Sequence, residues 1–490
     1  MAPIPLARIL AHWAALQPDR VAIDHHGAQV TWAELDARTN RLARHYQSLG
    51  VAPDSFVTIA LPNGIAFFEA CFAAWKAGAT PQPISSRLPK LERDQIVELG
   101  QPALVVGCAP DAYPGRACLA EGYAPDPTKS DDPLPEIMAT SLKAMTSGGS
   151  TGRPKLIVSA APAAWDPDVP YLEIPPQGVM LIPGPLYHNG PFLWAMVALF
   201  KGCTVGVTSR FDAEETLAQI ERLRADVIYT VPTMMRRIWA LPEATRARYD
   251  LSSLKALWHL AAPCPEWLKE RFIEWLGAEK IWELYGGTEG QGSTTIQGTD
   301  WLTRRGSVGR PVPTCEMKIV GENGETAPPG EIGEVYMRPV PAPGASAGPT
   351  YRYIGATAKA IDGGWESLGD MGWMDADGFL YLTDRLADMI LCGGANIYPA
   401  EVEAALDAFP GVRSSAVIGL PDEDLGNRIH AIVDRPEGSA DEAEFLGHLA
   451  ERLVRYKIPR SIEYVAEPLR DDAGKVRRAA LRAERMGKAG

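Results

Sequence analysis

The chain has 490 residues, a length that predicts two or more domains, because single hydrophobic cores rarely organise more than ~250–300 residues. Apolar residues make up 46% of the sequence and charged residues 22%, which is typical of a globular protein and excludes a mostly disordered or collagen-like chain. The formal net charge of -13 predicts repulsion from phosphate backbones and anionic lipids, so we expect no nucleic-acid partner.

The start of the chain predicts neither a signal peptide nor a membrane span. Residues 1–16 contain Arg8 within the stretch that a signal peptide would keep apolar, and their pattern is typical of an amphipathic first helix. The most apolar early stretch, residues 65–75, is interrupted by Glu69 and is shorter than the ~20 residues that a transmembrane helix needs. The seven scattered cysteines form neither a disulfide framework nor a C-x-x-C motif, so we expect a reducing, cytoplasmic location.

Through most of the first four-fifths of the chain, β-branched apolar runs alternate with amphipathic helical stretches, which is the pattern of βα units. One clear unit has a helix over residues 213–224 and a strand over residues 227–231, which Pro232 ends. The predicted fold class is therefore α/β for a large N-terminal, multilayer domain.

The later part of the chain has a different pattern. Residues 308–338 predict short strands in hairpins or a small β-barrel subdomain, and residues 339–349 predict a surface loop. The last hundred residues mix helices and strands, which we expect over residues 400–408 and 441–455 (helices) and 412–419 and 429–433 (strands). They predict a small C-terminal α+β domain.

The segment richest in hydroxyls and glycines consists of Thr146, Ser147, Gly148, Gly149, Ser150, Thr151, Gly152, Arg153, Pro154 and Lys155. Its glycines let the backbone approach an anion, and its hydroxyls and cations favour phosphate. The P-loop pattern fails, because Lys155 is followed by Leu156 rather than by serine or threonine. Residues 148–152 match the G-x-S-x-G nucleophile elbow, but an elbow opens a helix, whereas residues 156–158 predict a strand. From this segment alone, a hairpin loop without a ligand remains an alternative.

Five further motifs follow in order: Tyr285-Gly286-Gly287-Thr288-Glu289, Ser367-Leu368-Gly369-Asp370, Thr383-Asp384-Arg385-Leu386-Ala387-Asp388, Gly393-Gly394-Ala395-Asn396-Ile397-Tyr398-Pro399 and Gly474-Lys475. In their order and spacing, these motifs and the glycine-rich loop resemble the adenylate-forming superfamily over nearly the whole chain. That superfamily comprises acyl-CoA synthetases, aryl-CoA ligases, peptide-synthetase adenylation domains and luciferases. The glycine-rich segment at residues 285–292 most resembles the corresponding segment of CoA ligases for bulky acids, such as bile-acid and steroid CoA ligases.

The resemblance implies an ATP site. Tyr285 offers a flat face to adenine, Thr288 a hydrogen bond to phosphate, and Glu289 an oxygen ligand for Mg²⁺. Asp370 can accept hydrogen bonds from both ribose hydroxyls, a role that Arg385 shares by resemblance. The implied ATP-binding residues are Thr146, Ser147, Gly148, Gly149, Ser150, Thr151, Gly152, Lys155, Ala261, Ala262, Pro263, Tyr285, Gly286, Thr288, Asp370 and Arg385.

The resemblance also implies residues for catalysis and domain movement. His188 matches a gate between the ATP and acyl sites, although a histidine beside an apolar helix is as often a packed core residue. Lys475 matches a lysine that offsets the charge on the carboxylate and the α-phosphate. Ala387 stands at the hinge position, where the family usually has Asp or Lys, and Gly393 and Gly394 match a loop that lines the CoA tunnel.

The implied organisation is an N-terminal AMP-binding domain over residues 1–383, a hinge over residues 384–387, and a mobile C-terminal domain over residues 388–490. The implied reaction has two halves. A carboxylate attacks the α-phosphate of Mg·ATP and releases pyrophosphate, and the CoA thiol then displaces AMP. The alternatives are an adenylation enzyme that loads a carrier protein, a nucleotide-sensing protein without turnover, and a luciferase-type oxygenase.

The implied acyl pocket contains mostly small residues: His188, Asn189, Gly190, Gly286, Gly287, Gly290 and Gly292. Small residues leave room for a large substrate, and no lysine or arginine in these matched segments can pair with a second carboxylate. We therefore expect a bulky, cyclic monocarboxylic acid, with a medium-chain fatty acid or an aryl acid as the alternative. The sequence leaves the oligomeric state open, including a homodimer.

Overall fold

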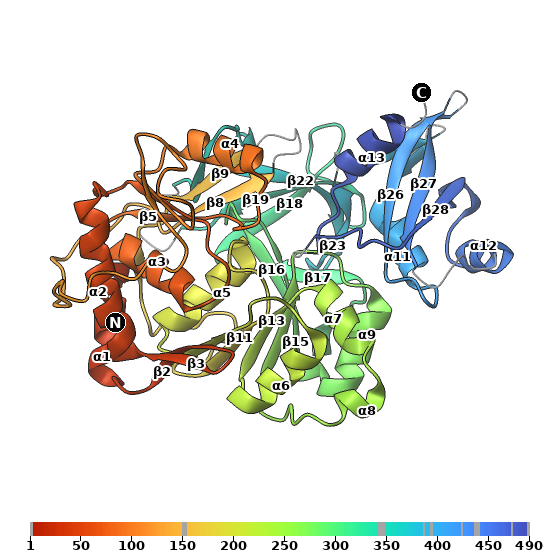
Figure 1. Cartoon of the computed structure of the whole chain (residues 1–490). Helices are drawn as coiled ribbons and strands as arrows, with labels where there is room; N and C mark the ends of the chain where they lie inside the picture. The colour runs from red at the N-terminus through yellow and green to blue at the C-terminus, as the bar shows by residue number, and fades with distance from the viewer. Residues whose placement is uncertain are drawn as a thin grey trace.

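The computed structural model describes residues 3–148, 154–341, 348–385, 388–392, 395–422, 425–435, 442–471 and 474–487. In Figure 1, the chain up to strand β23 (Leu380–Arg385) forms a large body of sheets covered by helices. The segments from β24 (Ile390–Cys392) onward form a smaller unit beside it, drawn in blue. This arrangement confirms the predicted fold class, a large α/β domain followed by a small α+β domain.

Within the described residues, the largest sheet has fourteen strands. Its parallel part runs in the order β15-β14-β13-β11-β12-β2, and its antiparallel part continues from β15 through β16, β17, β23, β22 and β19 to β18. The stretch predicted as hairpins or a small barrel forms three of these antiparallel strands. The strands are β2 (Val21–His25), β3 (Ala28–Thr31), β11 (Val179–Ile182), β12 (Thr204–Val207), β13 (Val227–Thr230), β14 (Ala256–Leu260), β15 (Ile281–Gly286), β16 (Ser293–Gln297), β17 (Ser307–Pro311), β18 (Cys315–Val320), β19 (Gly333–Pro339), β21 (Lys359–Ile361), β22 (Trp365–Met374) and β23.

Three smaller groups of strands complete the large domain. A parallel sheet has the order β5-β4-β6-β7, an antiparallel sheet has the order β20-β9-β8, and β1 pairs with β10. The strands are β1 (Ile4–Pro5), β4 (Phe56–Ile59), β5 (Thr80–Pro83), β6 (Leu104–Val106), β7 (Ala117–Leu119), β8 (Ala144–Gly148), β9 (Pro154–Ser159), β10 (Ala164–Trp165) and β20 (Tyr351–Ile354). Strands β8 and β9 are antiparallel neighbours, so the strand predicted over residues 156–158 is part of β9, while residues 149–153 lie outside the described residues.

The helices of the large domain pack on these sheets. They are α1 (Leu6–Leu16), α2 (Trp32–Ser48), α3 (Ile65–Lys76), α4 (Lys90–Gly100), α5 (Asn189–Phe200), α6 (Ala213–Leu223), α7 (Pro232–Trp239), α8 (Glu243–Arg246), α9 (Glu266–Leu276), α10 (Gly298–Trp301) and the 3-10 turn Ala278–Lys280. The main core lies among α1, α2, α3, α5 and the parallel strands, and it includes the buried rings of Trp75, Phe192 and Phe200.

The predicted βα unit shows why the local sequence folds in this way. Helix α6 begins after Asp212, whose Oδ1 accepts a hydrogen bond from the backbone N–H of Glu215 at 2.9 Å. Leu217 and Ile220, one turn apart, are buried on the face that packs on the sheet. Strand β13 follows, and Pro232 ends the strand pattern by opening α7, where its missing N–H costs nothing. Both predicted elements match the structure within one residue.

The C-terminal unit has its own hydrophobic core, which includes Ile397, Leu406, Phe445 and Leu449. Its strands are β24, β25 (Ala395–Ile397), β26 (Ser414–Asp422), β27 (Gly426–Asp434) and β28 (Ser461–Val465); its helices are α11 (Pro399–Asp407), α12 (Glu442–Ala450), α13 (Arg478–Gly487) and the 3-10 turn Arg455–Lys457. A separate core is what an independently folding domain needs. Ala387, the expected hinge residue, lies outside the described residues.

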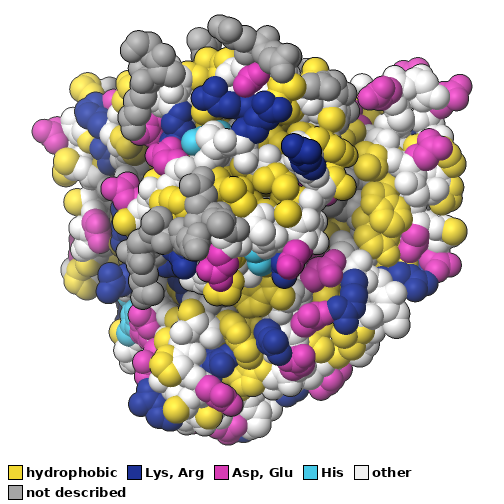
Figure 2. All heavy atoms as spheres, turned by 90° about the vertical axis from the view of Figure 1, so that its right-hand side faces the viewer, with side chains coloured by type: hydrophobic (Ala, Val, Ile, Leu, Met, Phe, Trp, Pro, Cys, Tyr) yellow, Lys and Arg dark blue, Asp and Glu magenta, His cyan; other side chains and the backbone are white. Residues whose placement is uncertain are grey.

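Figure 2 views the molecule from the side of the C-terminal unit. Acidic and basic side chains alternate there among hydrophobic ones, so on the visible, described part of this face the charge is spread rather than gathered into one patch. Of the helices in the described ranges, none is both long enough and apolar enough to cross a bilayer.

Candidate active site

A cavity of about 3810 Å³ opens between the large domain and the C-terminal unit. Most of the described site residues expected from the sequence line it together: Thr146, Lys155, His188, Asn189, Gly190, Ala261, Ala262, Pro263, Tyr285, Gly286, Gly287, Thr288, Glu289, Gly290, Gly292, Asp370 and Lys475. Residues 149–152, Ala387, Gly393 and Gly394 lie outside the described residues, and only the backbone is described for Ser147, Gly148 and Arg385.

Sheet topology explains why residues far apart in sequence meet here. Strands β14 and β15 are parallel neighbours, and the turn at residues 261–263 and the motif at residues 285–289 follow at their carboxyl ends. Ligands of open α/β sheets bind at that edge. Ala261 has φ of +72°, a left-handed conformation that non-glycine residues seldom adopt and that often occurs at functional sites.

Tyr285 and Asp370, the residues expected to hold adenine and ribose, contact each other. The Tyr285 hydroxyl donates a hydrogen bond to Oδ2 of Asp370 at 2.7 Å, and Asp370 is only 9% exposed. This bond holds the tyrosine hydroxyl beside the carboxylate. In the β22–β23 pairing, Asp370 lies opposite Arg385, so the backbone brings the two expected ribose ligands to adjacent strands.

Glu289, the expected Mg²⁺ ligand, is buried in a polar cluster. Its Oε1 accepts a hydrogen bond from the Tyr353 hydroxyl at 2.5 Å, and Lys155 Nζ lies 3.4 Å from the same oxygen. Lys155 also donates to the Tyr353 hydroxyl at 2.9 Å. Burial, reinforced by the bond to Glu289, raises the pKa of Tyr353 far above its ordinary value, so the hydroxyl remains a donor. Tyr353 was not identified from the sequence, since no motif marks it; only the pairing of β20 with β9 brings it here.

The oxygen atoms of Glu289 and Thr146 are suitable ligands for a magnesium ion that arrives with a nucleotide. The hydroxyl of Thr146, which lines the same cavity, is buried and has no hydrogen-bond partner within the described residues. Mg²⁺ prefers oxygen ligands and usually binds through one or two protein groups together with substrate phosphates. The described ranges contain no group of three His, Cys, Asp or Glu residues placed to hold a metal ion.

The glycines expected to line the acyl pocket all border the cavity, but at several of them a neighbouring side chain leaves little room for a Cβ. A side chain at Gly190 would collide with the Tyr229 ring and one at Gly287 with Leu368, while a Cβ at Gly292 would lie tightly, at 3.1–3.3 Å, against Met337 and Cys315. Gly290 alone among these glycines faces open space, with φ of +70°. The missing side chains therefore let neighbouring groups approach at least three of these positions.

His188 and Asn189 stand at the start of helix α5. His188 precedes the first helical turn, and its ring lies 4.4 Å from that of Tyr187. Asn189 Oδ1 accepts a hydrogen bond from the ammonium of Lys143, a buried residue that sequence reasoning missed. A lone lysine between apolar positions gives no motif, so only its burial in the structure identifies it.

Lys475 lines the cavity from a tight turn of the C-terminal unit. Its backbone N–H donates to Oδ1 of Asp471 at 2.9 Å, and Gly474 has φ of +78°, which favours glycine. A Cβ at Gly474 would lie 3.3 Å from the Thr233 hydroxyl, so the turn packs against the start of helix α7 in the large domain. This contact holds the lysine at the same cavity as Tyr285 and Asp370.

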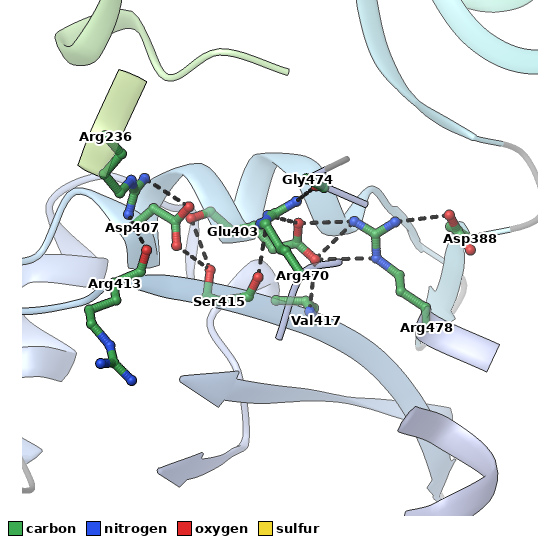
Figure 3. Close-up of polar contacts among 10 residues, drawn as sticks. All are labelled: Arg236, Asp388, Glu403, Asp407, Arg413, Ser415, Val417, Arg470, Gly474 and Arg478. Carbon is green, nitrogen blue, oxygen red and sulfur yellow. Dashed lines mark hydrogen bonds and ion pairs between the residues drawn. The ribbon is translucent and has the colours of Figure 1, made fainter. Parts of the chain in front are cut away.

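A buried ion-pair network ties that turn to helix α11 (Figure 3). Glu403, 4% exposed, accepts hydrogen bonds from Arg478 at 2.9 Å and from Arg470 at 3.2 Å. Arg478 also donates to Asp388 at 2.9 Å. The network therefore joins residues on both sides of Lys475 to the segment that follows the expected hinge.

Comparison with known protein families shows that the chain is an adenylate-forming enzyme. The chain belongs to the AMP-binding enzyme family, since the family model matches residues 10–340 and the model of the AMP-binding enzyme C-terminal domain matches residues 401–475. Its class is that of the AMP-forming acyl-CoA synthetases, which use ATP and CoA.

Three relatives show the range of this class. The chain is 34% identical to a feruloyl-CoA synthase from Amycolatopsis sp, over 96% of both chains. It is 32% identical to a (methyl-dioxo-octahydroindenyl)propanoyl:CoA ligase from Mycobacterium tuberculosis, over 95% of this chain and 96% of the relative. It is also 29% identical to a long-chain-fatty-acid–CoA ligase of Mycobacterium tuberculosis, over 93% of both chains.

A solved structure has the same fold. The o-succinylbenzoate CoA synthetase from Bacillus subtilis, in complex with its acyl-adenylate intermediate, matches with a TM-score of 0.81 and 25% identity, covering 98% of each chain. This likeness extends over both the large domain and the C-terminal unit.

Proposed function

We propose that this chain activates a bulky, ring-bearing monocarboxylic acid with ATP and transfers the acyl group to CoA. The observation that carries the proposal is that one cavity contains both the residues expected to bind adenine, ribose and phosphate and an aromatic wall from α5 and β13 that includes Trp194 and Tyr229. The ring-bearing substrates named for two of the relatives support this choice of acid.

Each residue has a role that its position supports. Tyr285 would stack on adenine, while Asp370 and Arg385 would accept and donate hydrogen bonds at the ribose. Lys475 would approach the carboxylate and the α-phosphate as charge develops there, and its ammonium would stabilise that charge in the first half-reaction. His188 would separate the acyl and nucleotide sites. Catalysis then consists of positioning and electrostatic stabilisation, with no covalent bond to the protein.

Glu289 and Thr146 would hold the magnesium ion that accompanies the nucleotide. When bound, the ion supplies positive charge that offsets the charge of the phosphates. In the structure Glu289 lines the cavity and already accepts hydrogen bonds from Lys155 and Tyr353, which hold its carboxylate in place. We propose that Lys155 turns from Glu289 to a phosphate when the nucleotide binds.

The proposal includes movement of two units, residues 1–383 and 388–490, about a hinge at residues 384–387, with Gly393 and Gly394 entering the CoA site after adenylate formation. The separate hydrophobic core of the C-terminal unit supports this division. A cytoplasmic location belongs to the same proposal, which leaves the assembly open between a monomer and a homodimer. All seven cysteines are unpaired, as a reducing compartment requires, and light scattering tests the assembly.

The test uses the purified chain with Mg·ATP and a panel of ring-bearing and straight-chain acids. We expect pyrophosphate release with ring-bearing acids, followed by CoA-dependent release of AMP and formation of a thioester. Pyrophosphate release with fatty acids alone would refute the substrate class. Pyrophosphate release that never leads to a CoA thioester, but does lead to an acylated carrier protein, would refute CoA as the acceptor.

A further inference from the structure

A buried cation lies behind the wall of the acyl cavity. Lys143 is 7% exposed, and burial lowers the pKa of its ammonium to about 8, against the opposing influence of Glu289. Within the described residues, the one hydrogen bond that its Nζ donates goes to Oδ1 of Asn189, a neutral acceptor. Buried lysines usually lie beside a carboxylate, as Lys76 lies beside Asp36 in this chain.

The chemistry of this contact fixes the orientation of the Asn189 side chain. An ammonium can only donate, so the atom of Asn189 that faces Lys143 must be the amide oxygen. The amide NH₂ is then on the other branch of the side chain. Asn189 lines the cavity and is half-buried, and its NH₂ donates to no residue in the described part of the chain.

The wall around Asn189 is otherwise mainly apolar. Gly190 follows it and lies against the ring of Tyr229, and the Trp194 and Tyr229 rings have centroids 6.0 Å apart. A few hydrogen-bonding groups in an apolar pocket are what fix the orientation and the identity of a small ligand. Asn189 therefore offers two N–H donors to an acid whose body carries an acceptor.

A second polar group in the same cavity also has no partner. Gln291 is 2% exposed, and neither its side-chain nitrogen nor its side-chain oxygen has a hydrogen-bond partner among the described residues. Leaving buried amide groups without hydrogen bonds is unfavourable. An acid with a purely hydrocarbon body could not satisfy either amide.

We propose that Asn189, held in orientation by Lys143, selects acids whose ring carries a hydrogen-bond-accepting oxygen, such as a carbonyl or a hydroxyl. Asn189 is the donor that contacts the substrate, and Lys143 is a positioning residue that acts through it. This inference rests on the proposed function and narrows its substrate class from any ring-bearing acid to an oxygenated one.

The test compares matched acids that differ only in the ring oxygen: 3-(4-oxocyclohexyl)propanoic acid with 3-cyclohexylpropanoic acid, and 4-hydroxycinnamic acid with cinnamic acid. The readout is the ratio of kcat/KM for pyrophosphate release within each pair. We expect the wild type to prefer the oxygenated member of at least one pair by ~10–100-fold, because a site that hydrogen-bonds an oxygen rejects the analogue lacking it.

Two variants separate selection from structural support. Asn189→Asp keeps a partner for Lys143 but replaces the donors by acceptors, so the preference for the oxocyclohexyl acid should disappear. Lys143→Met frees the amide to rotate, and the preference should fall at least several-fold. Lys76→Met is the control, because Lys76 is also buried but does not line the cavity, and its Nζ donates to Asn40 Oδ1 at 2.6 Å. This variant should keep the wild-type ratio.

Each result decides the question. A wild-type ratio near one for both pairs, or a ratio unchanged in both Asn189→Asp and Lys143→Met, would overturn the inference. If Asn189→Asp lowers kcat/KM equally for both members of a pair, the inference is overturned as well, because Asn189 would then serve the reacting carboxylate. These outcomes leave the proposed function intact, whereas absence of pyrophosphate release with every acid would refute the proposed function and this inference with it.

Discussion

Arg236→Ala should weaken the first half-reaction through a contact between the two units of the protein. Arg236, on α7 of the large domain, donates to Oδ2 of Asp407 on α11 at 3.0 Å and to the carbonyl oxygen of Arg413 at 3.1 Å. The side chains of Arg236 and Asp407 are 16% and 8% exposed, so solvent screens the pair only partly. Figure 3 shows Arg236 reaching across from its own helix to this pair of acceptors.

The geometry sets the size of the effect. A hydrogen bond to a charged group contributes ~1.5–3 kcal/mol, and each 1.4 kcal/mol changes an equilibrium by a factor of ten. Removing the guanidinium should therefore shift the equilibrium away from the observed arrangement by ~10–150-fold. Because this arrangement places Lys475 at the cavity, the rate of adenylate formation should fall by a factor that approaches this range.

The assay measures pyrophosphate release for the first half and thioester formation from supplied acyl-adenylate for the second. Arg236→Ala should slow the first and leave the second unchanged or faster. Arg237→Ala is the control, since Arg237 is the exposed neighbour on the same helix and should leave both rates at wild-type values. Equal losses in both halves, or equal behaviour of the two variants, would refute the idea that this contact favours one arrangement of the units.

Three further variants test the proposed roles of residues in the C-terminal unit and its hinge. Lys475→Ala should lower adenylate formation by ~10²–10³-fold, the scale for removing one preorganised charge-stabilising donor, and should spare thioester formation from supplied acyl-adenylate; equal loss of both halves would contradict the role. Gly394→Leu should keep pyrophosphate release and block thioester formation, and unchanged CoA turnover would count against a place in the CoA tunnel. Ala387→Pro should allow adenylate formation but arrest the rotation by fixing φ, and full thioester turnover would place the hinge elsewhere.

Local patterns predict most of the elements, because short-range chemistry determines them. The helical repeat of Leu217 and Ile220, and Pro232 as the end of a strand, place α6 and β13 within one residue. The site motifs follow strand ends, so the α/β pattern by itself brings Tyr285 to the ligand edge of the sheet.

The sequence pattern does not predict contacts between segments that lie far apart in the chain. Tyr353 lies 198 residues after its partner Lys155, and only the register of β20 on β9 brings them together. Lys143, just before β8, and Asn189, at the start of α5, are 46 residues apart, so neither residue suggests the other in the sequence. The sequence also does not predict the surroundings of a glycine. Gly190 lies against Tyr229, whereas Gly290 faces open space.

Helix α11 connects the turn that carries Lys475 with the contact between the C-terminal unit and the large domain. Glu403 and Asp407 are four residues apart and therefore lie on the same face of the helix. Glu403 binds Arg470 and Arg478 on either side of the Lys475 turn, while Asp407 binds Arg236 of the large domain. Because buried ion pairs join both flanks of Lys475 to α11, the proposed movement would carry Lys475 out of the cavity together with α11. We therefore expect the Arg236–Asp407 contact to influence both the arrangement of the two units and the position of Lys475.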